Sequence, residues 1–507
     1  MDTTAPFFWG SATASYQCEG AWQEGGKAES MWDRYLHEND LENGDVASDH
    51  YHRYREDIET MAKGGQNAYR FSLSWPRIIK NREGEVNEEG IAFYNSLIDT
   101  CHEFGVEPFV TIYHWDLPQY WEDEGGWLNE ETAHAFEHYA RVCFDRFGDR
   151  VRYWATFNEP KWFVMSGYLI GNYPPALQDP EKCAHAAFNV MYASALGVKA
   201  FRAGGYEGSI GIVHSFGPVD GMDDTLETKI AMRFADNYAN NWILDTAATG
   251  ELPIDLLTDL NRRFDLSYIT PDKLQALREG TVDFLGLNYY SRVLVRPYTD
   301  GETQLVVNNS GSAFKGSQRV VIKGWFEQVL DDPNMQTTEW GTEIYPDGLR
   351  RGLIEVTRRY HLPIYITENG IGVAEDVSQG EVQDDYRIAF MKDHIAAIKL
   401  PRKLGPTYAV ISYGAPSTCI HGRTGAASAM GLSRLTSRTG TPVPPRRATA
   451  GIAISSRASR LENPIRRRGN DEKSHVGVQR WDVHRHHGKE DRGGERGHPG
   501  GRCLRRG

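Results

Sequence analysis

The chain has 507 residues, of which 40% are hydrophobic and 11% aromatic, and this is enough apolar surface for a large folded core. Its net charge of -13 is unevenly distributed, because residues 1–400 carry 62 Asp and Glu against 35 Lys and Arg, whereas residues 401–507 carry 7 against 21. A reversal of this size argues against one uniform domain and predicts a boundary near residue 400.

The N-terminus and the cysteines exclude several classes of protein. Residues 1–14 lack a basic region followed by a long apolar run, so we expect no signal peptide, and no apolar run approaches the roughly 20 residues that span a membrane. The six cysteines are scattered and show no C-x-x-C or other metal-type spacing. We therefore expect free thiols and a soluble cytoplasmic protein.

Short apolar runs alternate with helical patterns along the first 400 residues. The expected strands are 7–12, 67–72, 106–116, 153–158, 208–214, 282–290 and a run that ends at Glu368. The expected helices are 53–64, 89–104, 130–147, 181–203, 224–248, 346–360 and 385–399. The segment 296–340 is polar and irregular, and we expect it to cross over the mouth of a site.

This alternation predicts an α/β protein with a parallel sheet. We expect a (β/α)8 TIM barrel, because most of the strands end in polar or aromatic residues and a barrel gathers such ends around one site. A doubly wound open sheet is the alternative, but no Gly-rich phosphate loop follows the first strand. A closed barrel needs an eighth strand, which should lie near 405–415.

Two of the strands end in glutamate, Glu159 after the fourth and Glu368 after the seventh. Strands four and seven face each other across a barrel, so the two carboxyl groups could flank one sugar, as glycoside hydrolysis requires. An Arg inside an apolar strand needs a buried acid, and Arg70 would pair with Glu368 and keep it ionised. Glu159, in a less charged setting, would retain its proton. The alternative is that both glutamates are solvated loop acids.

Three further polar residues lie at strand ends. Asn158 would hydrogen-bond the 2-hydroxyl of the sugar, a contact that strengthens in the transition state. His114 lies at the end of the third strand, beside Trp115, which favours a functional role over a structural one. Gln17 follows the first strand, where a turn residue is equally expected.

The chain resembles glycoside hydrolase family 1, the β-glucosidase family, from Phe8 to about Ile398. The motifs that carry the resemblance are Trp9-Gly10, Tyr16-Gln17-Cys18-Glu19-Gly20-Ala21, Tyr69-Arg70-Phe71-Ser72, Tyr113-His114-Trp115-Asp116-Leu117-Pro118, Thr156-Phe157-Asn158-Glu159-Pro160, Leu287-Asn288-Tyr289-Tyr290 and Ile366-Thr367-Glu368-Asn369-Gly370. The resemblance implies a TIM barrel and hydrolysis with retention of configuration.

The resemblance also implies roles for single residues. It makes Glu159 the acid/base and Glu368 the nucleophile. Arg70, Asn288 and Tyr290 would support the nucleophile, and Gln17, His114 and Asn158 would contact the bound sugar. It implies no metal and no cofactor, and a small-molecule β-glucoside or phosphorylated β-glucoside as partner. We expect no binding to nucleic acid or membrane, and the oligomeric state stays open.

The resemblance stops near residue 400, so we divide the chain into a truncated barrel domain, 1–400, and an aberrant basic tail, 401–507. The tail lacks aromatic interleaving and any recognisable module for nucleic-acid binding. A shifted reading frame explains it better. With permitted codons, reading from one base earlier turns 413–425 into a run containing Trp-Ser and Tyr-Ser-Trp, 428–431 into Lys-Arg-Tyr-Gly, and 450–457 into Trp-Tyr-Arg-Asp-Ile-Ile-Ser. These runs resemble the family's C-terminal motifs, in the right order.

The shifted frame has physical consequences. We predict that residues beyond about 403 are poorly ordered, that the eighth strand and last helix are lost or degraded, and that strands one and seven keep open edges. The chain as written would then be weakly stable and have little or no activity. Sequencing the coding DNA tests this, since codons that cannot spell those runs would contradict it.

Three functions stay open on the sequence. The first is a retaining β-glucosidase. The second is a 6-phospho-β-glucosidase, because the shifted frame places Ser where simple glucosidases usually carry a Glu for the outer hydroxyls, and Lys-Arg-Tyr follows, as in the phospho-specific branch of the family. The third is a catalytically silent carbohydrate-binding protein or the nonfunctional product of a damaged gene.

Overall fold

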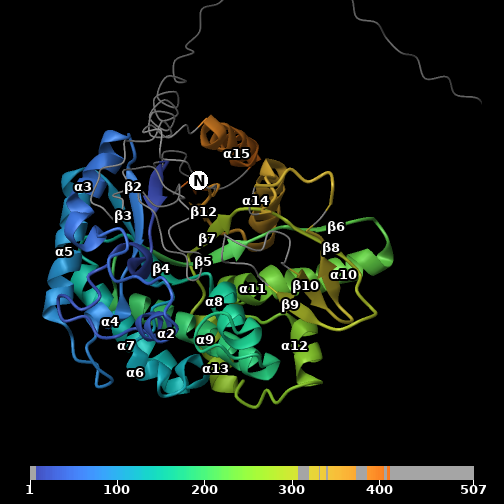
Figure 1. The fold of residues 1–507 in the computed structure, drawn as a ribbon, viewed down its shortest axis with the longest axis horizontal. Coiled ribbons are helices and arrows are strands. Elements are labelled where there is room, and N and C mark those ends of the chain that lie inside the picture. Colours follow the sequence, from blue (N-terminus) through green and yellow to red (C-terminus); the bar gives the residue numbers. More distant parts are fainter. Residues whose placement is uncertain are drawn as a thin grey trace, which may run out of the picture. The chain divides into compact units, whose positions relative to one another are not determined.

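The computed structural model describes residues 7–306, 319–330, 332–338, 341–372, 385–404 and 408–410, with side chains up to residue 398 (Figure 1). All of these residues belong to one compact unit, Met1–Arg460. The frame-shifted motifs and the predicted disorder of the tail lie outside the described residues, so both stay predictions. No helix in the described part of the chain is both long enough and apolar enough to cross a membrane.

An eight-stranded parallel sheet with alternating helices forms the expected (β/α)8 barrel (Figure 1). Its strands, in spatial and chain order, are β1 (Gly10–Ala12), β2 (Ala68–Ser72), β3 (Glu107–Tyr113), β4 (Tyr153–Asn158), β5 (Ser209–Phe216), β7 (Phe284–Tyr289), β12 (Ile364–Glu368) and β13 (Tyr408–Val410). Every residue of β2 and β7 is buried, as expected for strands covered on both faces.

The eighth strand lies in the expected interval but is only three residues long. Its residues pair in parallel with β12, in the register Ile364 with Tyr408 and Ile366 with Val410. The prediction that the strand bearing Glu368 keeps an open edge is therefore wrong, because β13 provides its neighbour over three residues. The described residues show no pairing between β13 and β1.

The helices lie close to their expected positions. The α-helices are α1 (Ser15–Cys18), α2 (Met31–Glu38), α3 (His50–Lys63), α4 (Trp75–Ile78), α5 (Glu88–Glu103), α6 (Gln119–Glu122), α7 (Glu130–Phe147), α8 (Pro160–Val164), α9 (Pro180–Gly204), α10 (Leu226–Asp236), α11 (Trp242–Thr249), α12 (Ile254–Asn261), α13 (Pro271–Glu279), α14 (Pro346–Tyr360) and α15 (Asp385–Leu404). A 3-10 helix, η1 (Gly126–Leu128), and two π-helices, η2 (Met165–Ile170) and η3 (Asn237–Asn241), complete the set.

The segment 296–340 is not irregular throughout, which corrects the expectation from sequence. It contributes to a second sheet, in the order β6 (Val219–Gly221), β8 (Val293–Arg296), β11 (Phe326–Gln328), β10 (Arg319–Ile322) and β9 (Gln304–Val306). Strands of three or four residues are too short to show a clear hydrophobic period. Buried Val320 and Phe326 join this small sheet to Ala231 and Ala235 of α10.

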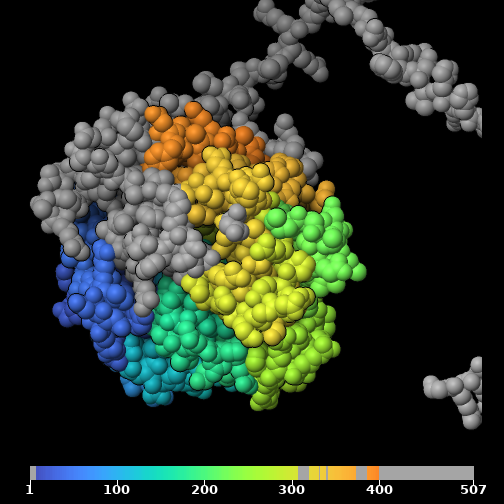
Figure 2. Space-filling view, turned by 45° about the vertical axis from the view of Figure 1, so that its right-hand side comes forward, coloured from blue at the N-terminus to red at the C-terminus, as the bar shows by residue number. Residues whose placement is uncertain are grey.

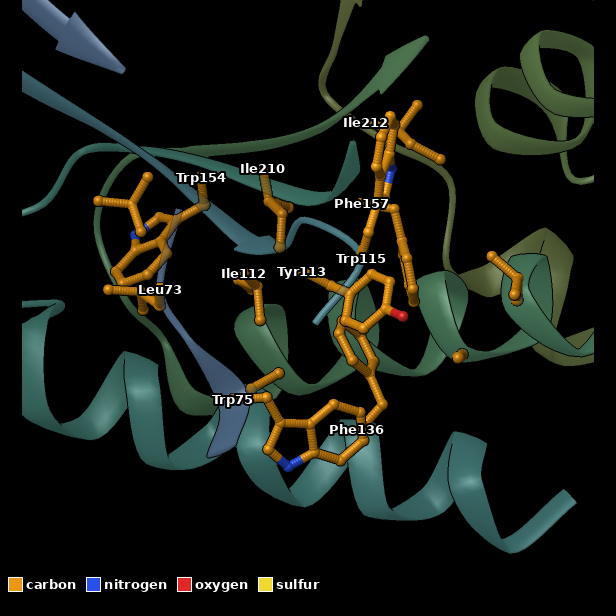
Figure 3. Close-up of a cluster of buried hydrophobic side chains, with 14 of the residues drawn as sticks. Leu73, Trp75, Ile112, Tyr113, Trp115, Phe136, Trp154, Phe157, Ile210 and Ile212 are labelled. Atoms are coloured by element: carbon orange, nitrogen blue, oxygen red, sulfur yellow. The ribbon is translucent and has the colours of Figure 1, made fainter. Parts of the chain in front are cut away.

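Two groups of buried side chains hold the barrel. Outside the sheet, aromatic rings pack between strands and helices, and Trp75 stacks on Tyr139 of α7 with ring centroids 5.0 Å apart. Figure 3 shows Trp75 and Phe136 beside each other in this layer. A smaller cluster, comprising Phe8, Phe109 and Phe284 with others, packs separately. Rings of this second cluster from β3, β7 and β12 contact one another, so it fills the inside of the barrel and leaves the carboxyl ends of the strands for polar groups.

Candidate active site

The backbone shifts register just before each of the two glutamates. The pairing of β4 with β5 is interrupted between Ala155 and Asn158, and that of β12 with β7 between Ile366 and Glu368. Such irregularities re-aim side chains and are common beside active sites. At the end of β4, Phe157 packs on Phe136, with ring centroids 4.5 Å apart, while the adjacent Asn158 joins the inner polar network, as the alternation of side chains along a strand allows.

Glu368 is held by a cation and a phenol, as the sequence predicts. Arg70 Nη1 donates to Glu368 Oε1 at 2.7 Å, and Tyr290 Oη donates to Oε2 at 2.6 Å. The Arg70 side chain is fully buried, whereas that of Glu368 is 17% exposed, so the carboxylate faces open space from a rigid support. Burial and the negative charge of Glu368 raise the pKa of Tyr290 well above its usual value, so the phenol keeps its proton.

Arg70 also joins the two strand ends. Its Nη2 donates to Asn158 Oδ1 at 2.7 Å, and its Nε donates to Thr111 Oγ1 at 3.0 Å. Asn158 in turn lies 2.8 Å from His114, between Nδ2 and Nε2. If the amide donates, the imidazole accepts through Nε2. The expected sugar contacts Asn158 and His114 are therefore brought together, and the guanidinium fixes the amide's orientation.

Glu159 has the less charged surroundings that the sequence predicts. It is buried, and Asn288 Nδ2 donates to its Oε1 at 2.7 Å. Burial, followed by repulsion from Glu368, raises the pKa of Glu159 to about 7. The hydrogen bond from Asn288 and the charge of Lys161 act in the opposite direction. One carboxyl group is therefore poised to hold a proton near neutral pH while its neighbour is paired with a guanidinium.

Asn288 does not support Glu368, and this corrects its expected role. Its amide donates to Glu159 and, at 3.1 Å, to Asn158 Oδ1, while its own Oδ1 accepts from Thr367 Oγ1 at 2.7 Å. Asn288 is the register partner of Glu368 on β7, after the shift between Ile366 and Glu368, yet its hydrogen bonds run to Glu159, Asn158 and Thr367. The contact of Thr367 with Asn288 is one that sequence reasoning missed.

The backbone at the site adopts a conformation that L-residues rarely take. Glu159 has φ 47° and Trp115 has φ 79°, both in the left-handed region. Glu159 N–H donates to Val213 O at 2.8 Å, and the Trp115 indole donates to Asn158 O at 2.9 Å. Local strain held in place by the surrounding structure is typical of functional sites.

Among the predicted site residues, Gln17 has the fewest contacts that support its expected role. It lies on α1, directly after β1, and is half-buried. The structure records no hydrogen bond from its side chain to another described residue. Its predicted contact with sugar therefore stays a prediction. Across the described residues, no group of three or more His, Cys, Asp or Glu side chains is placed to hold a metal ion.

Comparison with known proteins gives results of three kinds. The family model described as Glycosyl hydrolase family 1 matches residues 3–418. The aryl-phospho-beta-D-glucosidase BglC of Bacillus subtilis is 39% identical over 396 residues, covering 77% of this chain and 82% of BglC. A 6-phospho-beta-galactosidase of Clostridium acetobutylicum is 38% identical over 401 residues, covering 77% and 84%.

Solved structures of the same kind superpose closely. The family 1 β-glucosidase from Thermotoga maritima matches with a TM-score of 0.78 and 33% identity, covering 90% of this chain and 97% of its own. The GH1 β-glucosidase from Exiguobacterium antarcticum matches with a TM-score of 0.81 and 29% identity, covering 92% and 100%.

Proposed function

This chain belongs to glycosyl hydrolase family 1 and is a glycosyl hydrolase, and on that premise we propose that it hydrolyses terminal β-D-glucosides with retention of configuration. The observation that carries the proposal is the continuous network from Glu159 through Asn288, Asn158 and Arg70 to Glu368. It fixes two carboxyl groups with unlike surroundings at the ends of β4 and β12.

In the proposed reaction Glu368 is the nucleophile and Glu159 the acid and then the base. An oxygen of Glu368 forms a bond to the anomeric carbon as the bond from that carbon to the leaving oxygen breaks. Glu159 gives its proton to the leaving oxygen. In the second step Glu159, now ionised, takes a proton from water, and the water oxygen displaces Glu368 from the sugar.

The contacts of the two glutamates support this division of roles. The buried guanidinium of Arg70 contacts Glu368 and holds this carboxyl group in place for attack on the anomeric carbon. The raised pKa of Glu159, about 7, lets a carboxyl group act as an acid at neutral pH. Formation of the ester on Glu368 removes the negative charge that helps to raise this pKa. The pKa of Glu159 therefore falls just before this residue must act as the base.

Asn158 and His114 provide the binding part of the proposal. Arg70 and Asn288 both donate to Asn158 Oδ1, so this oxygen is already engaged and the amide Nδ2 faces His114. A sugar 2-hydroxyl at this position would meet a pair of groups whose orientations are already fixed, which lowers the entropic cost of binding.

A mechanism-based inactivator tests the roles directly. The test uses this sequence with its C-terminal part read in the shifted frame. A 2-deoxy-2-fluoro-β-glucoside with a good leaving group forms an ester with the enzyme that is hydrolysed slowly, so mass spectrometry of a proteolytic digest should find one sugar on the peptide that contains Glu368. Proton NMR of the first product should show the β-anomer. Labelling at another residue, or an α-anomer, would contradict the proposal.

A second candidate is hydrolysis of 6-phosphorylated β-glycosides. It is favoured by the names of the curated relatives, which act on phosphorylated sugars by their descriptions. The groups expected to distinguish the 6-position belong to the C-terminal segment, in the shifted frame. We define the frame-repaired chain as this sequence with its C-terminal part read in that frame. Comparing kcat/KM of the repaired chain for p-nitrophenyl β-glucoside and its 6-phosphate decides between the two substrates.

The same comparison tests the chain as written. We propose that its C-terminal part leaves the sugar site incomplete, so that the repaired chain is active and the written chain has little or no activity. Equal kcat/KM values for the two would contradict this. If both are inactive and the repaired chain is folded, by circular dichroism, the third possibility, a silent binding protein, is supported instead.

A further inference from the structure

A cavity of about 570 Å³ lies apart from the two glutamates, and none of the proposed catalytic or sugar-binding residues lines it. Three parts of the chain form its walls: residues between Met165 and Met191 on η2 and α9, residues between Tyr238 and Ile269 from η3 to the loop before α13, and Thr303, Leu305, Ile322 and Trp325 of the small sheet. Figure 2 shows the corresponding green, light-green and yellow parts of the chain adjoining on one face.

The walls of this cavity are aromatic and aliphatic, with large rings supplied by separate elements. Trp242 begins α11, Tyr268 precedes α13 and stacks on His185, and Trp325 lies between β10 and β11. Phe188 of α9 contacts Tyr268, with ring centroids 5.7 Å apart. Rings from several directions provide both the faces and the edges that a bound aromatic molecule prefers.

The cavity presents no uncompensated charge. Its charged lining residues, Asp259 and Arg263, pair with each other, from Arg263 Nε to Asp259 Oδ2 at 2.9 Å, and the guanidinium lies over Trp325. Burial raises the pKa of the Cys183 thiol to about 12, so the thiol stays neutral. An ionised ligand would therefore lose its hydration without gaining a partner.

The size and the surroundings of the cavity argue for a ligand rather than a packing defect. A volume of about 570 Å³ falls within the range of roughly 300–1,000 Å³ typical of small-molecule sites. Both π-helices of the described chain, η2 and η3, contribute to the walls, and this rare structure occurs frequently at functional sites.

We propose that this cavity is a binding site for an uncharged aromatic molecule, separate from the site at Glu159 and Glu368. The proposal does not depend on the hydrolytic function. Its ligand is a ring system of one or two fused rings, which stacks on the rings of Trp242, Tyr268 and Trp325.

The test measures binding of 2-naphthol to the full chain at pH 7, by isothermal titration calorimetry and by quenching of tryptophan fluorescence. Ala187 of α9 lines the cavity, and Ala187→Trp fills part of it with a ring. Ala92 is exposed on α5, away from the cavity, so Ala92→Trp is the matched control that adds the same side chain elsewhere. Circular dichroism establishes that each variant is folded, and Leu256→Trp is the second filling variant if Ala187→Trp does not fold.

We expect saturable binding with one site in the unmodified chain and in Ala92→Trp, at least tenfold weaker binding in the filled variant, and at least tenfold weaker binding of 2-naphthoate, which carries a charge. Binding should persist in Glu368→Ala, because Glu368 does not line the cavity. The proposal is overturned if 2-naphthol does not saturate, if the filled variant and the control bind equally, if 2-naphthoate binds as well, or if Glu368→Ala abolishes binding.

Discussion

The two strand ends that carry Glu159 and Glu368 hold the same side chain in opposite settings. At the end of β12, a buried guanidinium and a phenol contact both oxygens of Glu368. At the end of β4, the recorded partner of Glu159 is a neutral amide, and burial raises its pKa to about 7. Two residues of the same type therefore differ in their surroundings, and the surroundings of Glu159 are those that favour a protonated carboxyl group near neutral pH.

The strongest test of this comparison is to remove the carboxyl group that is paired with Arg70. In the frame-repaired chain, Glu368→Ala should lower kcat on p-nitrophenyl glucoside by on the order of 10⁴-fold or more, because the group that forms the intermediate is gone. Added azide should restore turnover and enter from the vacated face, giving the α-glucosyl azide, which NMR identifies. A β-azide would reverse the assignment of the two glutamates.

Glu159→Ala should have a smaller effect that depends on the leaving group. General acid catalysis contributes roughly 10²–10⁴-fold, so hydrolysis of alkyl glucosides should fall by that factor. Dinitrophenyl glucoside, whose leaving group needs no proton, should keep a rate of the first step close to that of the parent in stopped-flow measurements. Azide should here give the β-azide. An equal loss for both leaving groups would show that Glu159 is not the acid.

Arg70→Met removes the cation that distinguishes the two strand ends. Arg70 is fully buried and bonded to Glu368, Asn158 and Thr111, so its loss leaves three groups with an unmet partner. We expect a loss of about 3 kcal/mol of unfolding free energy, measured in urea, together with a large fall in kcat. Arg70→Lys keeps the charge but not the forked geometry, and should recover stability more than activity. Unchanged activity in Arg70→Met would remove Arg70 from the proposed site.

The pH profile sharpens the comparison without a substitution. Because the pKa of Glu159 is raised to about 7, the acid is protonated below that pH and kcat/KM should fall tenfold per pH unit above it. Labelling Glu368 with the inactivator removes the negative charge that raises this pKa. Carbon-13 NMR of the Glu159 carboxyl group should then show a lower pKa in the labelled chain, whereas an unchanged value would mean that Glu368 does not influence Glu159.

The smallest effect is expected at Thr367, one residue before Glu368, the proposed nucleophile. Its hydroxyl donates to Asn288 Oδ1, which orients the amide that bonds Glu159. Thr367→Val removes one buried hydrogen bond, worth about 1 kcal/mol, and should lower kcat/KM by about fivefold. The basic limb of the pH profile should move upward, because the bond from Asn288 lowers the pKa of Glu159. A limb that stays in place would assign Thr367 a purely structural role.

The sequence predicts the barrel and its charged pair because these depend on strong local signals. The fourth strand is observed at the predicted residues, 153–158, and a buried Arg in an apolar strand implies the acid that it finds in Glu368. The partner of Asn288 was not predictable, because the register shift between Ile366 and Glu368 has no marked residue type in the sequence. The small sheet was missed because its strands have only three or four residues, which is too few to show an alternation of hydrophobic and polar residues.

The left-handed backbone of Glu159 has a consequence for how the chain would change without selection for activity. A side chain at φ 47° is disfavoured relative to glycine, and burying a carboxyl group there adds a further cost. Glu159→Gly should therefore raise the melting temperature while it abolishes acid catalysis, which is a trade of stability against activity. Glu159→Gly thus separates the cost of this residue to the fold from its proposed role as the acid.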